Sequence, residues 1–244
     1  MKTHLYWRAL FLLLALAATG RAEINLLYLR HAEGGHNVVR KFQESGMPTN
    51  EWPAYVGKDN AFSPEGEAQA QAVVAPLQKH TFDLIAVSPT WRTRNTILPY
   101  LKATGQKAEI WPELAETANT DVLPSEGEIN PDLWSGKRAI RLSAEEADFF
   151  HLRADPPGLH ELVVSNRLEA VACAERVETL LRDRFNDQPA RVLLVGHGNA
   201  SRTLLRQLTR QPDARAEHLG NTRSWTGKEQ PDGSYAIERY NERP

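Results

Sequence analysis

Short, continuous apolar runs recur along this chain, and each one ends abruptly at polar residues. They occupy residues 24–30, 84–87, 109–111 and 191–195. Apolar runs of this length, without polar alternation, are typical of strands that are buried on both faces. Segments with helix signals separate them. Strands that alternate with helices predict an α/β fold, a three-layer sandwich whose mainly parallel central sheet carries helices on both faces.

The helix signals are clearest after the first long loop. Ser63 suits an N-cap, Pro64 suits the first helical position, and Glu65 and Glu67 would lie at the positive end of a helix that runs to about Lys79. A capping-box pattern at residues 143–146 predicts a short helix. Further helices are expected at residues 91–101, 166–185 and 199–210.

No repeat, linker or low-complexity tract divides the chain, so residues 23–244 are expected to form one domain. Residues 31–62 and 112–142 are expected to be irregular, because prolines interrupt both segments. The chain should close with a C-terminal hairpin of residues 222–225 and 235–240 around a Pro-Asp-Gly turn.

The first 22 residues have the three-part layout of a secretory signal peptide. A weakly basic start precedes an apolar run from Ala9 to Ala18, and Gly20 and Ala22 suit the −3 and −1 positions of a cleavage site. The run is shorter than the ~20 residues of a membrane-spanning helix. We therefore expect cleavage after Ala22, a secreted or periplasmic protein, and no stable membrane insertion. The alternative is a buried N-terminal helix or an uncleaved anchor.

The charge of the chain argues against nucleic acid as a partner. The 244 residues carry a formal net charge of −2, and removal of residues 1–22 would leave −5. An acidic protein lacks the basic field that attracts a phosphate backbone. The only cysteine, Cys173, excludes an intrachain disulfide, and its place between two alanines of an expected helix favours a small buried side chain.

The residues that follow the expected strands carry the chemistry. Arg30 and His31 end the first strand, Arg92 comes after the second, Glu116 after the third, and a Gly-His-Gly turn at 196–198 after the fourth. The carboxyl ends of parallel strands share one edge of a sheet, where ligand crevices lie. Arginine binds phosphate with a planar fork, and a neutral imidazole can attack phosphorus. The pattern therefore predicts a site that handles phosphate.

This ordered set of residues resembles the histidine phosphatase superfamily, also called the phosphoglycerate mutase-like family. The matching pieces are Arg-His at 30–31, Ser-Pro-x-x-Arg at 88–92, an acid at Glu116, Gly-His at 196–197, the helix start at 63–70 and the closing hairpin. The resemblance extends over about residues 24–241. One departure is Ala32, which stands where the family usually has glycine.

The resemblance implies metal-independent hydrolysis of a small-molecule phosphate ester, with no cofactor. His31 would be the nucleophile and would form a phosphohistidine, and neighbouring positive charge would keep it neutral. Glu116 would protonate the leaving oxygen and then activate the water that hydrolyses the intermediate. Glu113 and Asp121 compete with Glu116 for this role.

The same resemblance implies a set of groups around the phosphate. Arg30, Arg92 and His197 would surround the phosphoryl oxygens and neutralise the charge that develops on them. Asn37 and the backbone amide of Gly198 are candidate further donors, although Asn37 could equally serve as a hydrogen-bonding residue of its loop.

The walls of the pocket are expected from residues 38–62 and 117–142. Trp52, Tyr55 and Trp134 could stack on a substrate there, or could simply pack within their loops. The basic residues Lys137, Arg138 and Arg141 are better explained as a solvated charge run than as a second anion site.

Two other classes of hydrolase fit the sequence less well than a histidine phosphatase does. A metallohydrolase would use the cluster of His31, Glu33 and His36, but its spacing is not the His-Glu-x-x-His of a metal-binding helix. A serine hydrolase lacks its Gly-x-Ser-x-Gly turn. A phosphoglycerate mutase-type phosphotransferase and a non-catalytic protein that binds a phosphorylated ligand remain as alternatives.

Overall fold

The computed structural model describes residues 23–116, 142–153, 167–185, 188–212 and 217–244. The expected signal peptide, Asp121, Trp134 and the basic residues between 137 and 141 lie outside these ranges. In the described part of the chain, no helix is both long and apolar enough to cross a membrane.

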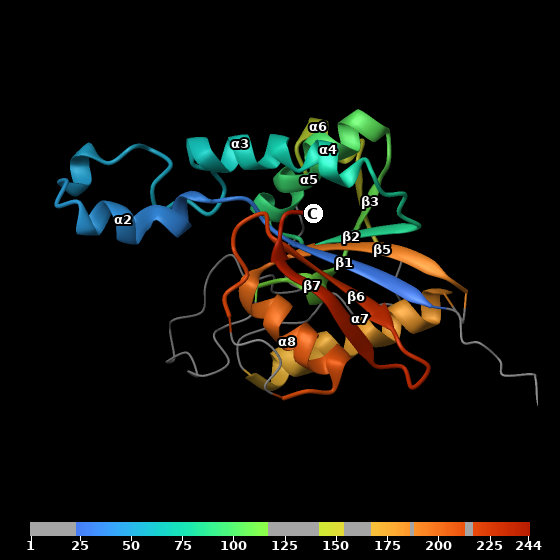
Figure 1. Cartoon of the computed structure of the whole chain (residues 1–244). Helices are drawn as coiled ribbons and strands as arrows, with labels where there is room; N and C mark the ends of the chain where they lie inside the picture. The colour runs from blue at the N-terminus through green and yellow to red at the C-terminus, as the bar shows by residue number, and fades with distance from the viewer. Residues whose placement is uncertain (1–22, 117–141, 154–166, 186–187, 213–216) are drawn as a thin grey trace, which may run out of the picture.

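One seven-stranded sheet organises the described residues (Figure 1). Its strands are β1 (Ile24–Arg30), β2 (Leu84–Val87), β3 (Ala108–Ile110), β4 (Phe150–Leu152), β5 (Ala190–Gly196), β6 (Ser224–Glu229) and β7 (Tyr235–Glu242). The strand order is β4-β3-β2-β5-β1-β6-β7. The first five strands in this order run parallel, and β6 and β7 are antiparallel to their neighbours. The predicted α/β fold with a C-terminal hairpin is confirmed.

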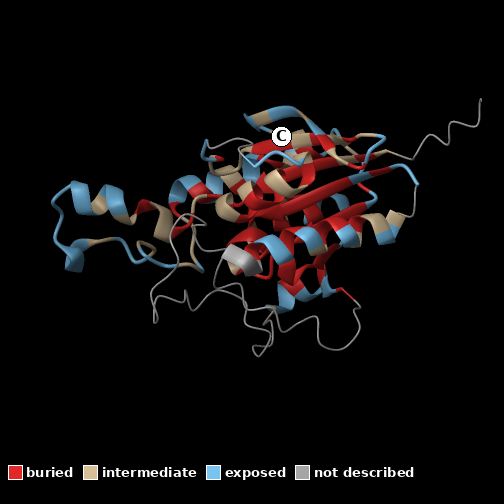
Figure 2. Cartoon of the chain, turned by 90° about the horizontal axis from the view of Figure 1, so that it is seen from below, coloured by how far each residue is buried: buried red, intermediate tan, exposed pale blue. Residues whose placement is uncertain are grey.

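Helices cover both faces of the sheet (Figure 1). On one face lie α3 (Pro64–Ala72), α4 (Val74–Leu77), α5 (Trp91–Thr104) and the short α6 (Ala144–Ala147); on the other lie α7 (Arg167–Phe185) and α8 (Gly198–Thr209). Side chains of β1 alternate between the two layers, since Leu26 and Tyr28 pack with α7 and α8 whereas Leu27 and Leu29 pack with α4 and α5. The buried residues accordingly run through the middle of the molecule (Figure 2).

The helix expected at residues 64–79 is interrupted. Ser63 caps α3 by accepting a hydrogen bond from the Gly66 N–H at 3.0 Å, as its sequence position suggested. The helix ends at Ala72 and α4 begins at Val74. Pro76 explains the interruption, because it has no N–H to donate to the carbonyl four residues earlier.

The segment at residues 31–62, expected to be irregular, contains two short 3-10 helices, η1 (Gly35–Val38) and η2 (Thr49–Glu51), and the helix α2 (Val39–Glu44). The part with α2 extends away from the sheet and is largely exposed (Figures 1 and 2). Trp52 and Tyr55 pack around Phe42, with ring centroids 6.0 and 6.4 Å from it. These two aromatic residues therefore pack within their own segment.

Two further elements differ from the sequence expectations. β4 was not expected, because a strand of three residues at the edge of the sheet leaves almost no pattern in the sequence. Near residue 112 a short 3-10 helix, η3 (Pro112–Leu114), follows β3. Cys173 is 1% exposed within α7, which agrees with the small buried role expected for it.

Candidate active site

Parallel strands β1 and β5 end side by side and deliver the first residues of the site. In the register of the sheet, Arg30 lies opposite Gly196, and Val87 of β2 lies opposite Val195. The N–H of His31 donates to the Gly196 carbonyl at 3.0 Å, which fixes its backbone at this edge. The residues that follow three neighbouring strands are thereby brought together, as the sequence predicted.

His31 is buried, with only 1% of the residue exposed. Its Nδ1 lies 2.7 Å from the Ala32 carbonyl oxygen. Because a carbonyl can only accept, Nδ1 carries the proton and Nε2 keeps a lone pair. Burial, followed by the charges of Arg92 and Arg30, holds the pKa of His31 well below its usual range. The imidazole is thus neutral, which is the form a nucleophile requires.

The second imidazole, His197, is completely buried, and its ring centroid lies 5.1 Å from that of His31. The Arg92 Nη2 donates to its Nδ1 at 3.2 Å. Since a guanidinium only donates, the proton lies on Nε2, which donates to the Ser88 Oγ at 2.8 Å. Burial, followed by the charge of Arg92, holds the pKa of His197 well below its usual range. The turn at residues 88–92 therefore orients this ring.

Two arginines lie beside the histidines. Arg30 is 6% exposed and Arg92 is 2% exposed. The Arg30 Nη1 donates to the Leu219 carbonyl at 2.6 Å and contacts the His218 ring. Within the described residues, the Nε of each arginine has no hydrogen-bond partner. A buried donor without a partner costs roughly 1–3 kcal/mol, so an anion such as phosphate would be stabilised here.

Two glutamates were expected to compete for the role of proton donor. The Glu113 carboxylate is buried and accepts two hydrogen bonds from Arg153, at 2.8 and 3.1 Å. By contrast, the Glu116 Oε2 lies 3.4 Å from the His197 Nδ1, and its side chain is 21% exposed. Of the two, Glu116 faces the histidines and can exchange protons with solvent, whereas Glu113 forms a buried ion pair.

Asn37 and Gly198 also lie at the site. The Asn37 Oδ1 accepts hydrogen bonds from the Gly34 N–H at 2.9 Å and from the Asn221 side chain at 3.4 Å. This oxygen therefore stabilises the loop, and the amide nitrogen is the part of Asn37 suited to a phosphate. Gly198 begins α8, and a Cβ built on it would lie 3.7 Å from the Arg30 Nε. Its amide belongs to the first turn, whose N–H groups have no acceptor within the helix.

Two residues at the site were not assigned from the sequence. The Asp59 Oδ1 lies 3.3 Å from the His36 Nδ1 and 3.9 Å from the Arg92 Nη1. The Asn221 side chain donates to the His31 carbonyl at 3.0 Å. An aspartate in an irregular segment and an asparagine before a hairpin strand carry no local signal of function. The fold alone brings them to the strand ends.

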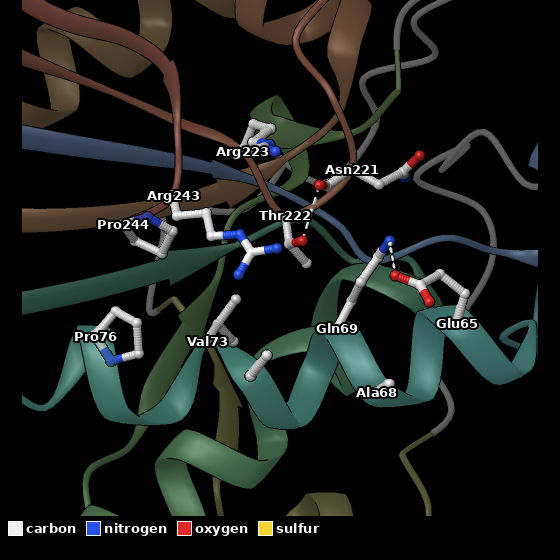
Figure 3. A pocket seen from close by; sticks show the side chains of 11 residues that line it. Glu65, Ala68, Gln69, Val73, Pro76, Asn221, Thr222, Arg223, Arg243 and Pro244 are labelled. Carbon is white, nitrogen blue, oxygen red and sulfur yellow. Dashed lines mark hydrogen bonds between the residues drawn. The ribbon is translucent and has the colours of Figure 1, made fainter.

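A cavity of about 290 Å³ lies between α3 and the loop at residues 221–223 (Figure 3). On one wall of this cavity, the Thr222 N–H donates to the carbonyls of Arg30 and His31 at 3.2 and 3.3 Å. On the opposite wall, the Gln69 Oε1 accepts from the Glu33 N–H at 2.9 Å. Residues around this cavity therefore hold the backbone of the site in place.

Three side chains of the site are of the types that bind metal ions. One ligand atom from each of His31, Glu116 and His197 lies within 4.8 Å of the others. However, the buried guanidiniums of Arg30 and Arg92 adjoin the same imidazoles and would repel a divalent cation. The charges of the site therefore suit an anion better than a metal ion.

Glu33 and His36, which the sequence places near His31, make contacts of their own with other residues. The Glu33 Oε1 accepts from the Ser63 Oγ at 2.6 Å, at the start of α3. His36 faces Asp59 instead, and its ring centroid lies 5.6 Å from that of His31. Glu33 is therefore part of the helix cap and not of the histidine cluster.

Comparisons with known proteins agree with this architecture. Solved structures with the same fold include "Mycobacterial hydrolase 1" (20% identity, TM-score 0.56, covering 91% of this chain and 100% of that one). They also include a mycobacterial glucosyl-3-phosphoglycerate phosphatase in complex with VO3 (20% identity, TM-score 0.56, covering 89% of this chain and 98% of that one). A third is a phosphoserine phosphatase mutant from Entamoeba histolytica in complex with phosphoserine (16% identity, TM-score 0.51, covering 89% of this chain and 96% of that one).

Among the curated proteins compared with this chain, none matches it. The family model described as "Histidine phosphatase superfamily (branch 1)" matches residues 26–243, which is nearly the whole chain. The matched range contains the site residues Arg30, His31, Arg92, Glu116 and His197. The chain belongs to the histidine phosphatase superfamily.

Proposed function

We propose that the protein hydrolyses small-molecule phosphate monoesters without a metal, through a phosphohistidine on His31. The observation that carries this proposal is the pairing of two buried, neutral imidazoles with two buried guanidiniums at one sheet edge. Such a cluster combines a nucleophile with fixed positive charge for the phosphoryl oxygens. Two of the proteins with similar solved structures are phosphatases, which supports the same reaction class.

In the first step, the lone pair on the His31 Nε2 forms a bond to phosphorus while the ester P–O bond breaks. Glu116, protonated at this point, gives its proton to the departing oxygen, so an alcohol leaves and the phosphoryl group remains on His31. Arg30 and Arg92 donate hydrogen bonds to the phosphoryl oxygens, and His197 donates through Nδ1 only when that nitrogen takes up a proton, because its Nε2 proton is held by Ser88. These donors are already oriented by the fold, so their stabilisation requires little reorganisation.

In the second step, the Glu116 carboxylate accepts a proton from water, and the water oxygen attacks phosphorus. The P–N bond breaks, its electron pair returns to the His31 Nε2, and inorganic phosphate leaves. Glu116 is then protonated again for the next turnover. The partial exposure of its side chain supports this role, because both the leaving alcohol and the attacking water must reach it.

Phosphate release from an aryl phosphate, and from a panel of sugar phosphates, nucleotides, inositol phosphates and phosphopeptides, tests the proposal. We expect turnover by the wild type and none by His31→Ala, because no other residue can take up the phosphoryl group in its place. His151→Ala is a matched control, since this histidine is exposed on the edge strand β4. Rapid quenching with radiolabelled substrate should trap an acid-labile phosphohistidine in the wild type.

Three outcomes would contradict the proposal in different ways. Substantial turnover by His31→Ala would exclude the phosphohistidine. Phosphate binding without turnover would favour a non-catalytic binding protein. Transfer of the phosphoryl group to a second phosphorylated substrate, with little release of inorganic phosphate, would favour a mutase.

A further inference from the structure

Tyr28 lies directly beneath the second histidine of the site. Its hydroxyl accepts a hydrogen bond from the His197 N–H at 2.8 Å and donates one to the His197 carbonyl at 3.0 Å. The residue is completely buried, and its ring stacks on that of Trp225 with centroids 5.3 Å apart and planes 7° from parallel. One hydroxyl thus holds both backbone polar groups of His197.

This contact requires the glycine that precedes His197. A Cβ built on Gly196 would lie 2.1 Å from the Tyr28 Oη and 2.9 Å from its Cζ. Gly196 is therefore the residue that lets the phenol of β1 reach the end of β5. Tyr28 and Gly196 form a matched pair that is recognisable only in the folded protein.

The backbone of His197 matters because its ring is oriented from two sides. Ser88 and Arg92 hold the imidazole nitrogens, whereas Tyr28 holds the main chain from which the imidazole projects. The residue also caps α8, in an extended conformation with φ −126° and ψ 167°. If the Tyr28 hydroxyl were lost, this turn could shift and the ring would shift with it.

We propose that Tyr28 is a positioning residue for the reaction at His31: its hydroxyl fixes the backbone of His197 so that the imidazole faces the phosphoryl oxygens. This inference rests on the proposed function. A displacement of about 1 Å at a catalytic group can lower a rate by about 100-fold. Because His197 is proposed to act mainly as charge develops on the phosphoryl group, the loss should appear in kcat more than in KM.

The test replaces Tyr28 with phenylalanine, which keeps the ring and its stacking on Trp225 but removes the hydroxyl. Ser201→Ala is the matched control, because the Ser201 Oγ accepts a buried hydrogen bond from the Trp225 Nε1 at 2.8 Å in the same layer. The control removes a buried hydrogen bond but leaves the contacts of Tyr28 with His197 intact. Both variants are assayed at a temperature at which circular dichroism shows them folded.

For Tyr28→Phe we expect kcat to fall roughly 10- to 100-fold with KM changed by less than about threefold. Affinity for vanadate, whose complex resembles the transition state, should fall in the same proportion as kcat/KM. Ser201→Ala should keep both quantities within about twofold of the wild type. If the two variants have the same kcat and the same vanadate affinity, Tyr28 is only a structural residue and the inference is overturned.

The two proposals fail in distinguishable ways. If the wild type releases no phosphate from any ester but binds vanadate, the proposed function fails and the vanadate affinities of the two variants alone decide the role of Tyr28. If the wild type neither releases phosphate nor binds vanadate, both proposals are wrong.

Discussion

Lowering the pH from 8 to 5.5 should destabilise this protein through the same two imidazoles that form its site. Burial and the neighbouring arginines hold the pKa values of His31 and His197 well below the usual range, so both stay neutral in the folded protein. In the unfolded chain each binds a proton below about pH 6.5. The unfolded state then carries more protons, so stability is lost as the pH falls through this value.

The expected magnitude follows from proton linkage. At pH 5.5 a histidine that is protonated only in the unfolded state lowers the free energy of unfolding by roughly 1–2 kcal/mol relative to pH 8. For His31 and His197 together the loss is about 3 kcal/mol. Carboxylates with a lowered pKa, such as Glu146 and Glu178, contribute at more acidic pH, so this window isolates the histidines.

Urea unfolding at several pH values, followed by tryptophan fluorescence in phosphate-free buffers, measures this effect. A double variant, His31→Asn with His197→Asn, should lose about 3 kcal/mol less stability between pH 8 and pH 5.5 than the wild type. His80 and His218, whose pKa values burial also lowers, remain in both proteins and cancel in this comparison.

His151→Asn serves as a control for the substitution itself, because this histidine is exposed and lies outside the site. If the double variant loses as much stability as the wild type over this range, the two site histidines are not buried in the neutral form. The reasoning about the nucleophile would then be wrong as well.

Four other predictions concern the two glutamates, the metal and the N-terminus. Glu116→Gln should lower kcat/KM by about 100-fold or more for an alkyl phosphate but much less for p-nitrophenyl phosphate, whose leaving group needs no proton; equal losses would contradict its role. Glu113→Gln should leave kcat nearly unchanged but lower the free energy of unfolding in urea by about 3–5 kcal/mol, because it removes the carboxylate charge that faces the buried Arg153 guanidinium. Dialysis against a chelator should not lower activity, and a loss that zinc restores would favour a metal site. When the full chain is expressed in a secreting host, the intact mass of the purified protein should match a chain that begins at Glu23, and retention of residues 1–22 would argue against a signal peptide.

Much of the fold and the site could be read from the sequence, because the signals are local. A continuous apolar run that stops at Arg30 and His31 predicts a buried strand with a polar end. The Ser63 cap and the Gly-His-Gly turn at 196–198 are equally local, and they lie where the structure has the starts of α3 and α8. Because parallel strands end at one edge, the convergence of their polar ends follows from the order of the elements.

What the sequence could not decide depends on partners distant along the chain. Glu113 and Glu116 are indistinguishable by pattern, and the choice between them comes from Arg153, which pairs with Glu113 across 40 residues. The proton on the His31 Nδ1 is fixed by the way the chain turns at Ala32.

The contact between Tyr28 and His197 spans 169 residues and exists only because glycine occupies position 196. In each of these cases packing between distant segments sets the burial, the hydrogen-bond partner or the available space. Local sequence patterns do not determine these three properties.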